Sequence, residues 1–307
     1  MEILNIFLNV LLPILILISI GAFLHRQFQF DLSTLAKINI YYLIPGLIFT
    51  RLYETDLAWN MFADVLIFFL ALSAVLYFVS KIISKIFRFH RGMQLAFSHS
   101  TMFFNSGNYG VPVNDLAFKQ DPFAMAIQVL ILTFQNLLVY SYGIITLQAG
   151  SQGFFKSLIP YFKMPITYAM LLGIGLNVFD IRLPDFIYTP GSYIADALIG
   201  IALLTLGAQV VQLNFSKNMW NVFLSISVRL MVAPLAAYII ILFLDVNTMT
   251  AQAMFIASAA PSSVNSAIIA QEYENEPSFA SQAVLFSTIF SVITVTLVIY
   301  LSGILFK

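Results

Sequence analysis

One apolar stretch in the first half of the chain is interrupted at its centre by residues that a helix does not favour. The stretch runs from Gly92 to Phe118 and is long enough to cross a bilayer, yet residues 105–112 read NSGNYGVP. Proline cannot donate a helical hydrogen bond, and glycine lets the backbone leave helical geometry. Inside a membrane, backbone groups freed in this way are tolerated only where protein or a water-filled cavity satisfies them. The stretch therefore predicts a broken helix beside a cavity at membrane depth.

The composition of the chain is that of an integral membrane protein. Of its 307 residues, 60% are hydrophobic and 9% are charged, where a soluble chain carries about 25% charged residues. The formal net charge is zero and no basic tract is concentrated, so no nucleic-acid partner is expected. Cysteine is absent, which excludes disulfides and thiolate metal sites, and neither a metal nor another cofactor is expected. The first apolar run follows Met1-Glu2 and not basic residues, so we expect a retained span and not a cleaved signal peptide.

Apolar segments long enough to cross a hydrocarbon core of about 30 Å recur along the whole chain. We expect a single transmembrane domain over residues 1–307, of the all-α class, whose fourth and ninth spans are broken. The ten predicted spans are residues 3–24, 32–52, 61–80, 92–118, 122–147, 164–180, 190–213, 219–244, 248–272 and 278–306.

The two halves of the chain resemble each other. Pro, Gly and Leu at residues 13, 21 and 24 recur at residues 165, 173 and 176, an offset of 152 positions. Near the same offset from the first interruption lies a second one, SAAPSSVNSAIIAQEY at residues 258–273. Paired interruptions in corresponding positions point to the binding site of a transporter. Because five spans per half is an odd number, the pattern predicts inverted repeats over residues 1–147 and 164–307, joined by a linker at 148–163.

Lysine and arginine in short loops predict the orientation, because these residues are retained on the cytoplasmic side. The loop before the fourth span carries four of them, and alternating outward from it gives eight cations inside against four outside. Both termini are therefore expected outside. The inner cations are Lys81, Lys85, Arg88, Arg91, Arg26, Lys156, Lys163 and Lys217, and the outer ones are Arg51, Lys119, Arg182 and Lys307.

Several motifs resemble the auxin efflux carrier family, which includes plant PIN proteins and bacterial relatives described as malate or organic-acid permeases. The motif NSGNYGVPV at residues 105–113 looks like the broken fourth span of that family. The other matching motifs follow in the family's order over the whole chain: Ala195-Asp196-Ala197 and Leu206-Gly207-Ala208, then Arg229-Leu230 with Pro234, then Pro261 and Ala270-Gln271-Glu272-Tyr273.

The resemblance implies ten helices in two inverted five-helix repeats, with helices four and nine crossing at unwound centres, as in bile-acid symporters and NhaA-like proteins. In PIN proteins the asparagine that heads the fourth-span motif is associated with the substrate carboxylate, and it aligns with Asn105. The crossover proline aligns with Pro261. The chain lacks the long loop of plant PIN proteins. This places it with the bacterial members, in the plasma membrane of the cell, and makes auxin a less suitable substrate.

The interruptions also predict an anion site on physical grounds. Half-helices starting near Pro112 and near Ser262 would aim their amide groups and positive dipole ends into one cavity. The half-helix ends near Phe104 and Ala260 supply carbonyl oxygens that suit a small cation instead. The polar side chains around them either bind substrate or only cap the broken helices. The candidate substrate-binding residues are Asn105, Ser106, Gly107, Asn108, Gly110, Pro112, Pro261, Ser262, Ser263 and Asn265.

Two charged residues are predicted deep in later spans. Asp196 lies six residues after Pro190, roughly 9 Å into the span at 1.5 Å per residue. Arg229 lies about 12 residues into the next span and reaches a similar depth. Charges inside a membrane are costly and are often functional. The two residues are expected either to take part in ion coupling, for example by binding a proton, or to form a buried salt bridge.

The sequence favours a secondary transporter that moves a small organic anion, malate-like or auxin-like, by alternating access. A cation/proton antiporter of NhaA-like architecture is the alternative, although no adjacent acids lie near the interruptions. An enzyme is not expected, because a hydrolase would need a base for a buried serine, and His99 lies on the wrong stretch for Ser262. A passive channel, a coupling proton or sodium ion, and a homodimer remain open.

Overall fold

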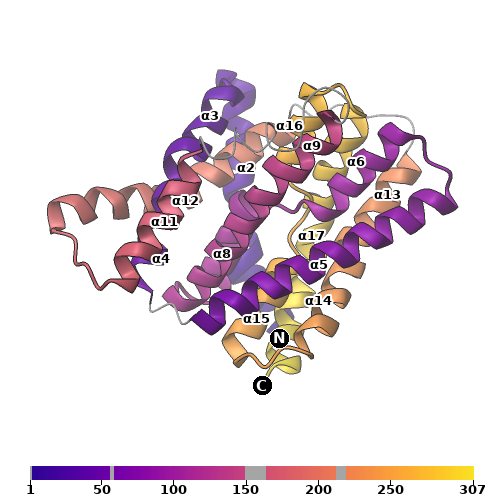
Figure 1. Cartoon of the computed structure of the whole chain (residues 1–307). Coiled ribbons are helices and arrows are strands. Elements are labelled where there is room, and N and C mark those ends of the chain that lie inside the picture. Colours follow the sequence, from indigo (N-terminus) through magenta and orange to yellow (C-terminus); the bar gives the residue numbers. More distant parts are fainter. Residues whose placement is uncertain (1, 56–58, 149–163, 212–218) are drawn as a thin grey trace.

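The structure, a computed structural model, describes residues 2–55, 59–148, 164–211 and 219–307. These residues form helices joined by short turns, and the one β-bridge among them joins Phe104 to Ser262 (Figure 1). Apart from Gln148, the predicted linker lies outside the described residues, as does Lys217.

Helices occupy each of the predicted apolar segments. In the first half they are α1 (Glu2–Ile6), η1 (Phe7–Leu11), α2 (Leu12–Phe28), α3 (Leu32–Ile38), η2 (Asn39–Leu43), α4 (Ile44–Glu54), α5 (Trp59–Ile86), α6 (Arg91–Met102), η3 (Ser106–Gly110), α7 (Val111–Ala117), α8 (Pro122–Leu138), η4 (Val139–Gly143) and α9 (Ile144–Gln148). In the second half they are α11 (Pro165–Val178), α12 (Asp185–Val211), α13 (Met219–Ser227), η5 (Val228–Val232), α14 (Ala233–Ile241), α15 (Thr248–Ser258), α16 (Val264–Glu272) and α17 (Pro277–Leu305). The η segments are π-helical turns inside longer helices.

The described residues confirm an all-α membrane protein. Seven of their continuous helical stretches are long and apolar enough to cross a bilayer, and Pro165–Val178 is a shorter apolar helix. The fourth and ninth predicted spans are the interrupted ones, formed by α6 with η3–α7 and by α15 with α16. The count of ten spans and the inverted repeats stay predictions.

The helices pack in two groups. Helices α2, α3 and α4 contact α12, and α11 contacts α4; with the turn η2, which contacts α4 and α12, they form what we call the panel. Helices α5–α8 and α13–α17, which contain both interrupted spans, form what we call the crossing bundle. In Figure 1 the panel helices α4, α11 and α12 lie on the left, and α5, α6, α13 and α14 lie on the right. The panel meets the crossing bundle where α4 packs on α8 and where α12 packs on η3.

The panel is held together by a close contact between α2 and α12. A Cβ atom added at Gly207 would overlap the carbonyl oxygen of Ile18, and one added at Gly21 would overlap that of Leu204. Small residues let membrane helices approach until their backbones touch, which increases the van der Waals contact that drives association in lipid. The two glycines are therefore needed for the spacing of these helices.

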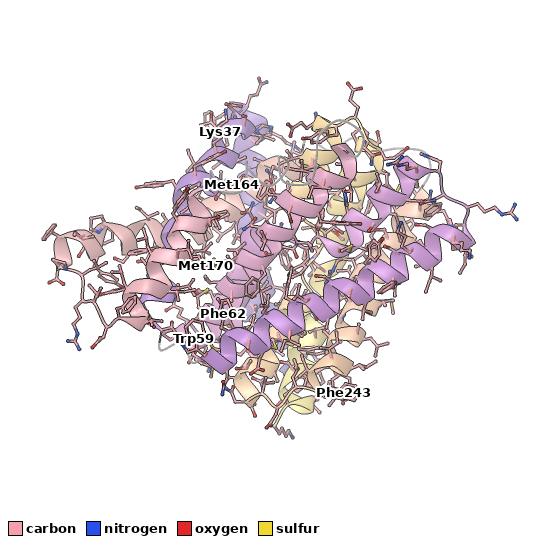
Figure 2. All side chains as sticks on the ribbon, viewed as in Figure 1. Lys37, Trp59, Phe62, Met164, Met170 and Phe243 are labelled. Atoms are coloured by element: carbon pink, nitrogen blue, oxygen red, sulfur yellow. The ribbon has the colours of Figure 1, made fainter. Side chains whose placement is uncertain are left out.

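The ends of the helices carry residues typical of a membrane interface. Lys37 is exposed at the top of Figure 2, whereas Trp59 and Phe243, which are 68% and 85% exposed, lie towards the bottom. Lysine reaches water from a helix end, and tryptophan favours the boundary between lipid and water. Both chain ends also lie at the bottom, where α1 contacts α17 (Figure 1).

Candidate functional site

The two interrupted spans meet at their breaks. Helix α6 ends at Met102 and α15 ends at Ser258. Between the following segments, the Asn105 N–H donates to the Pro261 carbonyl at 2.8 Å, and the Ser263 N–H donates to the Phe103 carbonyl at 2.8 Å. These bonds flank the antiparallel bridge between residues 104 and 262. The prediction that both spans are broken and that their breaks lie together is confirmed.

The first break lies earlier in the chain than the position predicted from Gly107, Gly110 and Pro112. Helical structure resumes at Ser106 and not near Pro112, which sits in the first turn of α7. Gly110 has a different role, because a Cβ atom there would lie 2.5 Å from the Gln128 Nε2 atom. That nitrogen donates to the Ser106 carbonyl at 2.8 Å. Gly110 therefore allows α8 to pack closely against the restarted helix, and the unwound residues are 103–105.

The serines of the second break hold the crossing in place. The Ser262 hydroxyl donates to the Ser100 carbonyl at 2.7 Å, and the Ser262 N–H donates to the Ser287 hydroxyl oxygen at 3.0 Å. The Ser263 hydroxyl oxygen accepts the Asn265 N–H at 3.2 Å and caps α16. Ser262 is 0% exposed, so both of its polar groups are used inside the protein. Its contacts are those of a structural residue.

A polar pocket lies against the crossing, between the panel and the crossing bundle. It is narrow, because the centre of a water molecule can reach only about 40 Å³ of it. The panel lines it through Asn39, Thr205 and Gln209, and α8 lines it through Gln135 and Asn136. The remaining lining residues are Ala36, Ile40, Ile44, Phe104, Asn105, Ser106, Gly107, Asn108, Leu132, Val139, Ser263, Val264, Asn265 and Ile268.

The pocket brings together part of the predicted site. The predicted residues that line it are Asn105, Ser106, Gly107, Asn108, Ser263 and Asn265. The predicted residues outside its lining are Gly110, Pro112, Pro261 and Ser262. Sequence reasoning missed the contribution of the panel, and for Gln135 and Asn136 of α8 it left open whether they bond to neighbouring helices or line the cavity. An isolated Asn or Gln in an apolar span is the signal that could have found Asn39 and Gln209.

Several amide groups of the pocket are buried without a hydrogen-bond partner among the described residues. The Oδ1 atom of Asn39 and the Oε1 atom of Gln209 lack a partner, and so do, on three further side chains, the Nδ2 atoms of Asn105 and Asn136 and both polar atoms of Gln135. The three side chains are at most 5% exposed. Buried polar groups in proteins are almost always hydrogen-bonded, and leaving one unpaired costs about 1–3 kcal/mol. Their convergence on one pocket is the arrangement expected of groups that bind a polar ligand.

A positive charge lies close to the pocket. Within the described ranges, the residues that line the pocket include no Asp, Glu, Lys or Arg. Arg229 lies behind Phe104, with its guanidinium carbon 5.0 Å from the centroid of that ring. The helical runs that begin at Ser106 and Val264 start at the pocket and add the positive ends of their dipoles. These positive groups favour a negative ligand, while the carbonyl ends of α6 and α15, which oppose them, are bound by Arg229.

The predicted buried pair of Asp196 and Arg229 is wrong. Asp196 is paired with Arg51, whose Nη2 atom lies 3.5 Å from its Oδ1 atom, and its side chain is 66% exposed. Arg229 is 0% exposed and donates to the carbonyls of Thr101 and Ser258. Similar depth in two neighbouring spans did not place the side chains together, because the helices turn them towards different neighbours.

Four of the five π-helical turns among the described residues lie around the crossing. The turns η2, η3 and η4 each contribute residues to the pocket lining, and η5 carries Arg229. A π-helical turn redirects backbone and side-chain groups within a helix and is frequent at functional sites. The irregular backbone of four helices is thus concentrated where the polar groups converge.

Comparison with known proteins finds similarity to membrane transporters. A family model described as a membrane transport protein matches residues 6–299. An uncharacterized transporter of Methanothermobacter thermautotrophicus is 26% identical over 276 residues, which cover 87% of this chain and 88% of that protein.

Proposed function

Because this chain belongs to the membrane transport protein family, that of the auxin efflux carriers, we propose that it is a secondary transporter for a small organic anion. It is a multi-pass membrane protein of a transporter family. The proposal adds a carboxylate substrate, malate-like or auxin-like, bound in the pocket at the crossing. The bacterial plasma membrane is its proposed location.

The observation that carries the proposal is a pocket lined by amides, with a buried cation behind it. Carboxamide side chains reach the pocket from η2, η3, α8, α12 and α16. Amide N–H groups donate to carboxylate oxygens, and hydrogen bonds to a charged group are worth about 1.5–3 kcal/mol each. The candidate contacts are Asn105, Asn108 and Asn265 together with Gln135 and Asn136. The apolar side chains of Ile44, Leu132 and Ile268 would contact the carbon skeleton of the acid.

The position of the pocket supports alternating access. The pocket lies between two groups of helices, so a movement of one against the other would change the side from which a substrate reaches it. We assign the moving part to the crossing bundle. Inverted repeats over residues 1–147 and 164–307, in ten spans, would supply two related conformations of the crossing. In the predicted orientation, with both termini outside, α3 and the neighbouring Asn39 lie towards the cytoplasm.

A cation/proton antiporter is less consistent with the pocket. Such an exchanger needs a carboxylate that binds either a proton or a metal ion, and within the described ranges no acidic side chain lines the pocket. The acids Asp115 and Asp196 lie elsewhere, near Arg51.

Uptake by purified protein in liposomes tests the proposal. We expect labelled malate or an aromatic acetic acid to accumulate, to compete with unlabelled acid, and to exchange faster when acid is present on both sides. Protein-free liposomes give the background, and parallel assays with and without a pH gradient report coupling. Sodium or proton flux that needs no organic acid, with no acid uptake, would contradict the proposal and favour the antiporter.

A further inference from the structure

Arg229 is a fully buried cation at the crossing. Its side chain lies on η5 and is 0% exposed. The ion pairs of the described residues do not include it. Burying an unpaired charge is costly, both in a protein interior and at membrane depth. Other groups must therefore stabilise the guanidinium, and their identity indicates what the residue does.

The stabilising groups are the last carbonyls of the two broken helices. The Arg229 Nη1 atom donates to the carbonyl of Thr101, near the end of α6, at 3.0 Å. The Nη2 atom donates to the carbonyl of Ser258, the last residue of α15. The C-terminal end of a helix carries unpaired carbonyls and the negative end of the dipole. One guanidinium thus joins the negative ends of both half-helices, and the Phe104 ring adds a cation–π contact.

These two carbonyls lack helical partners because of the crossing itself. In an unbroken helix the Thr101 carbonyl would accept the N–H of Asn105, and the Ser258 carbonyl would accept the N–H of Ser262. The Asn105 N–H donates to Pro261 instead, and the Ser262 N–H donates to Ser287. Arg229 therefore binds both of these carbonyls, those of Thr101 and Ser258.

Carbonyl oxygens at unwound helix ends are the ligands that coordinate a coupling cation in transporters with broken helices. We propose that Arg229 is a tethered substitute for such a cation, which holds the two half-helix ends together without a soluble ion. The inference deepens the proposed function and rests on it for the transport cycle. Its consequence is that carboxylate transport needs no sodium at the crossing, because the positive charge is part of the chain.

The tethered charge also acts on the substrate site. The guanidinium stays behind Phe104, which itself lines the pocket. A fixed positive charge in a medium of low dielectric raises the affinity for an anion and lowers it for a cation. Arg229 is therefore a positioning residue that acts through the half-helix ends and through its field, and it is not assigned a direct contact with substrate.

Removal and chemical replacement of the guanidinium test this inference. We expect Arg229→Ala to lower the midpoint of thermal unfolding in detergent by roughly 10 °C, because two buried carbonyls lose their donor. Guanidinium chloride at low millimolar concentration should restore the midpoint saturably, while choline chloride at equal ionic strength should not. The unfolding midpoint and the acid uptake of the wild-type protein should be equal in sodium and choline salts.

Two substitutions of similar length separate charge from packing. Arg229→Lys keeps a cation and should remain closer to the wild type than Arg229→Met, which fills the space without a charge. If Arg229→Ala does not fold, the inference is tested by comparing the unfolding midpoints and the uptake of Arg229→Lys and Arg229→Met. Wild-type stability and uptake in Arg229→Met, absence of rescue by guanidinium in a folded Arg229→Ala, or a sodium requirement of the wild-type protein would each overturn the inference. The thermal measurements need no substrate, so they can fail or succeed independently of the uptake assay that tests the proposed function.

Discussion

Replacing Asn105 with alanine should lower carboxylate uptake about 10- to 150-fold at concentrations well below KM. The Nδ2 atom of Asn105 is buried, has no partner among the described residues and lies at the pocket. A hydrogen bond from such a group to a charged ligand is worth about 1.5–3 kcal/mol, and each 1.4 kcal/mol corresponds to about tenfold in affinity. The initial rate of labelled-acid uptake into liposomes with equal amounts of protein measures the effect.

Asn114 provides a matched control for this substitution. It is also a buried asparagine of the first broken span, with both side-chain polar atoms unpartnered among the described residues, but it does not line the pocket. Asn114→Ala should therefore leave the KM for the acid close to that of the wild-type protein. Equal uptake by Asn105→Ala and the wild type, or equal loss in both variants, would contradict the assignment of Asn105 to the substrate.

Replacing Gly207 with alanine should destabilise the panel strongly. The added Cβ would overlap the Ile18 carbonyl oxygen, which belongs to the backbone of α2 and cannot rotate away. The two helices must then separate, and overpacking of this kind costs about 1–3 kcal/mol or more. We expect the midpoint of thermal unfolding in detergent to fall by about 3–10 °C. Fluorescence-detected size exclusion after heating measures the fraction that stays folded.

The same substitution at Gly200 is the control, because it lies on the same helix with nothing within 4 Å of the added atom. Alanine favours a helix over glycine by roughly 0.5–1 kcal/mol, so Gly200→Ala should leave stability unchanged or raise it. A Gly207→Ala protein as stable as Gly200→Ala would show that α2 and α12 do not pack as closely as described.

The positions of the helices and of both interruptions could be predicted from the sequence, because apolar length and helix-breaking residues are local signals. The location of the first break within its span was predicted less well. Gly107 and Gly110 lie inside η3, where the absence of a Cβ atom makes room for α8, and the chain unwinds at residues 103–105. A glycine has the same appearance in the sequence whether it frees the backbone or admits a neighbouring helix, so the distinction required the tertiary structure.

Only the part of the candidate site that belongs to the two interrupted spans could be predicted from the sequence. Asn105, Asn108 and Asn265 belong to the motifs, but Asn39 and Gln209 reach the pocket from the panel, and nothing local indicates that helices so distant in sequence share a cavity. The pairing of Asp196 with Arg229 failed for a related reason. Depth along a helix follows from residue number, whereas the direction in which a side chain points depends on the packing of neighbouring helices.

The most direct test of the central claim, that an organic anion binds in the pocket at the crossing, is protection of a single cysteine from labelling. The chain contains no cysteine, so Asn265→Cys would carry the only thiol. Asn265 lines the pocket and is partly exposed, whereas Gln27 is exposed and outside the pocket lining, which makes Gln27→Cys the control. We predict that a transported carboxylate slows the reaction of a water-soluble maleimide with Asn265→Cys and leaves the rate at Gln27→Cys unchanged. An unchanged rate at Asn265→Cys, in protein that still takes up the acid, would contradict the account.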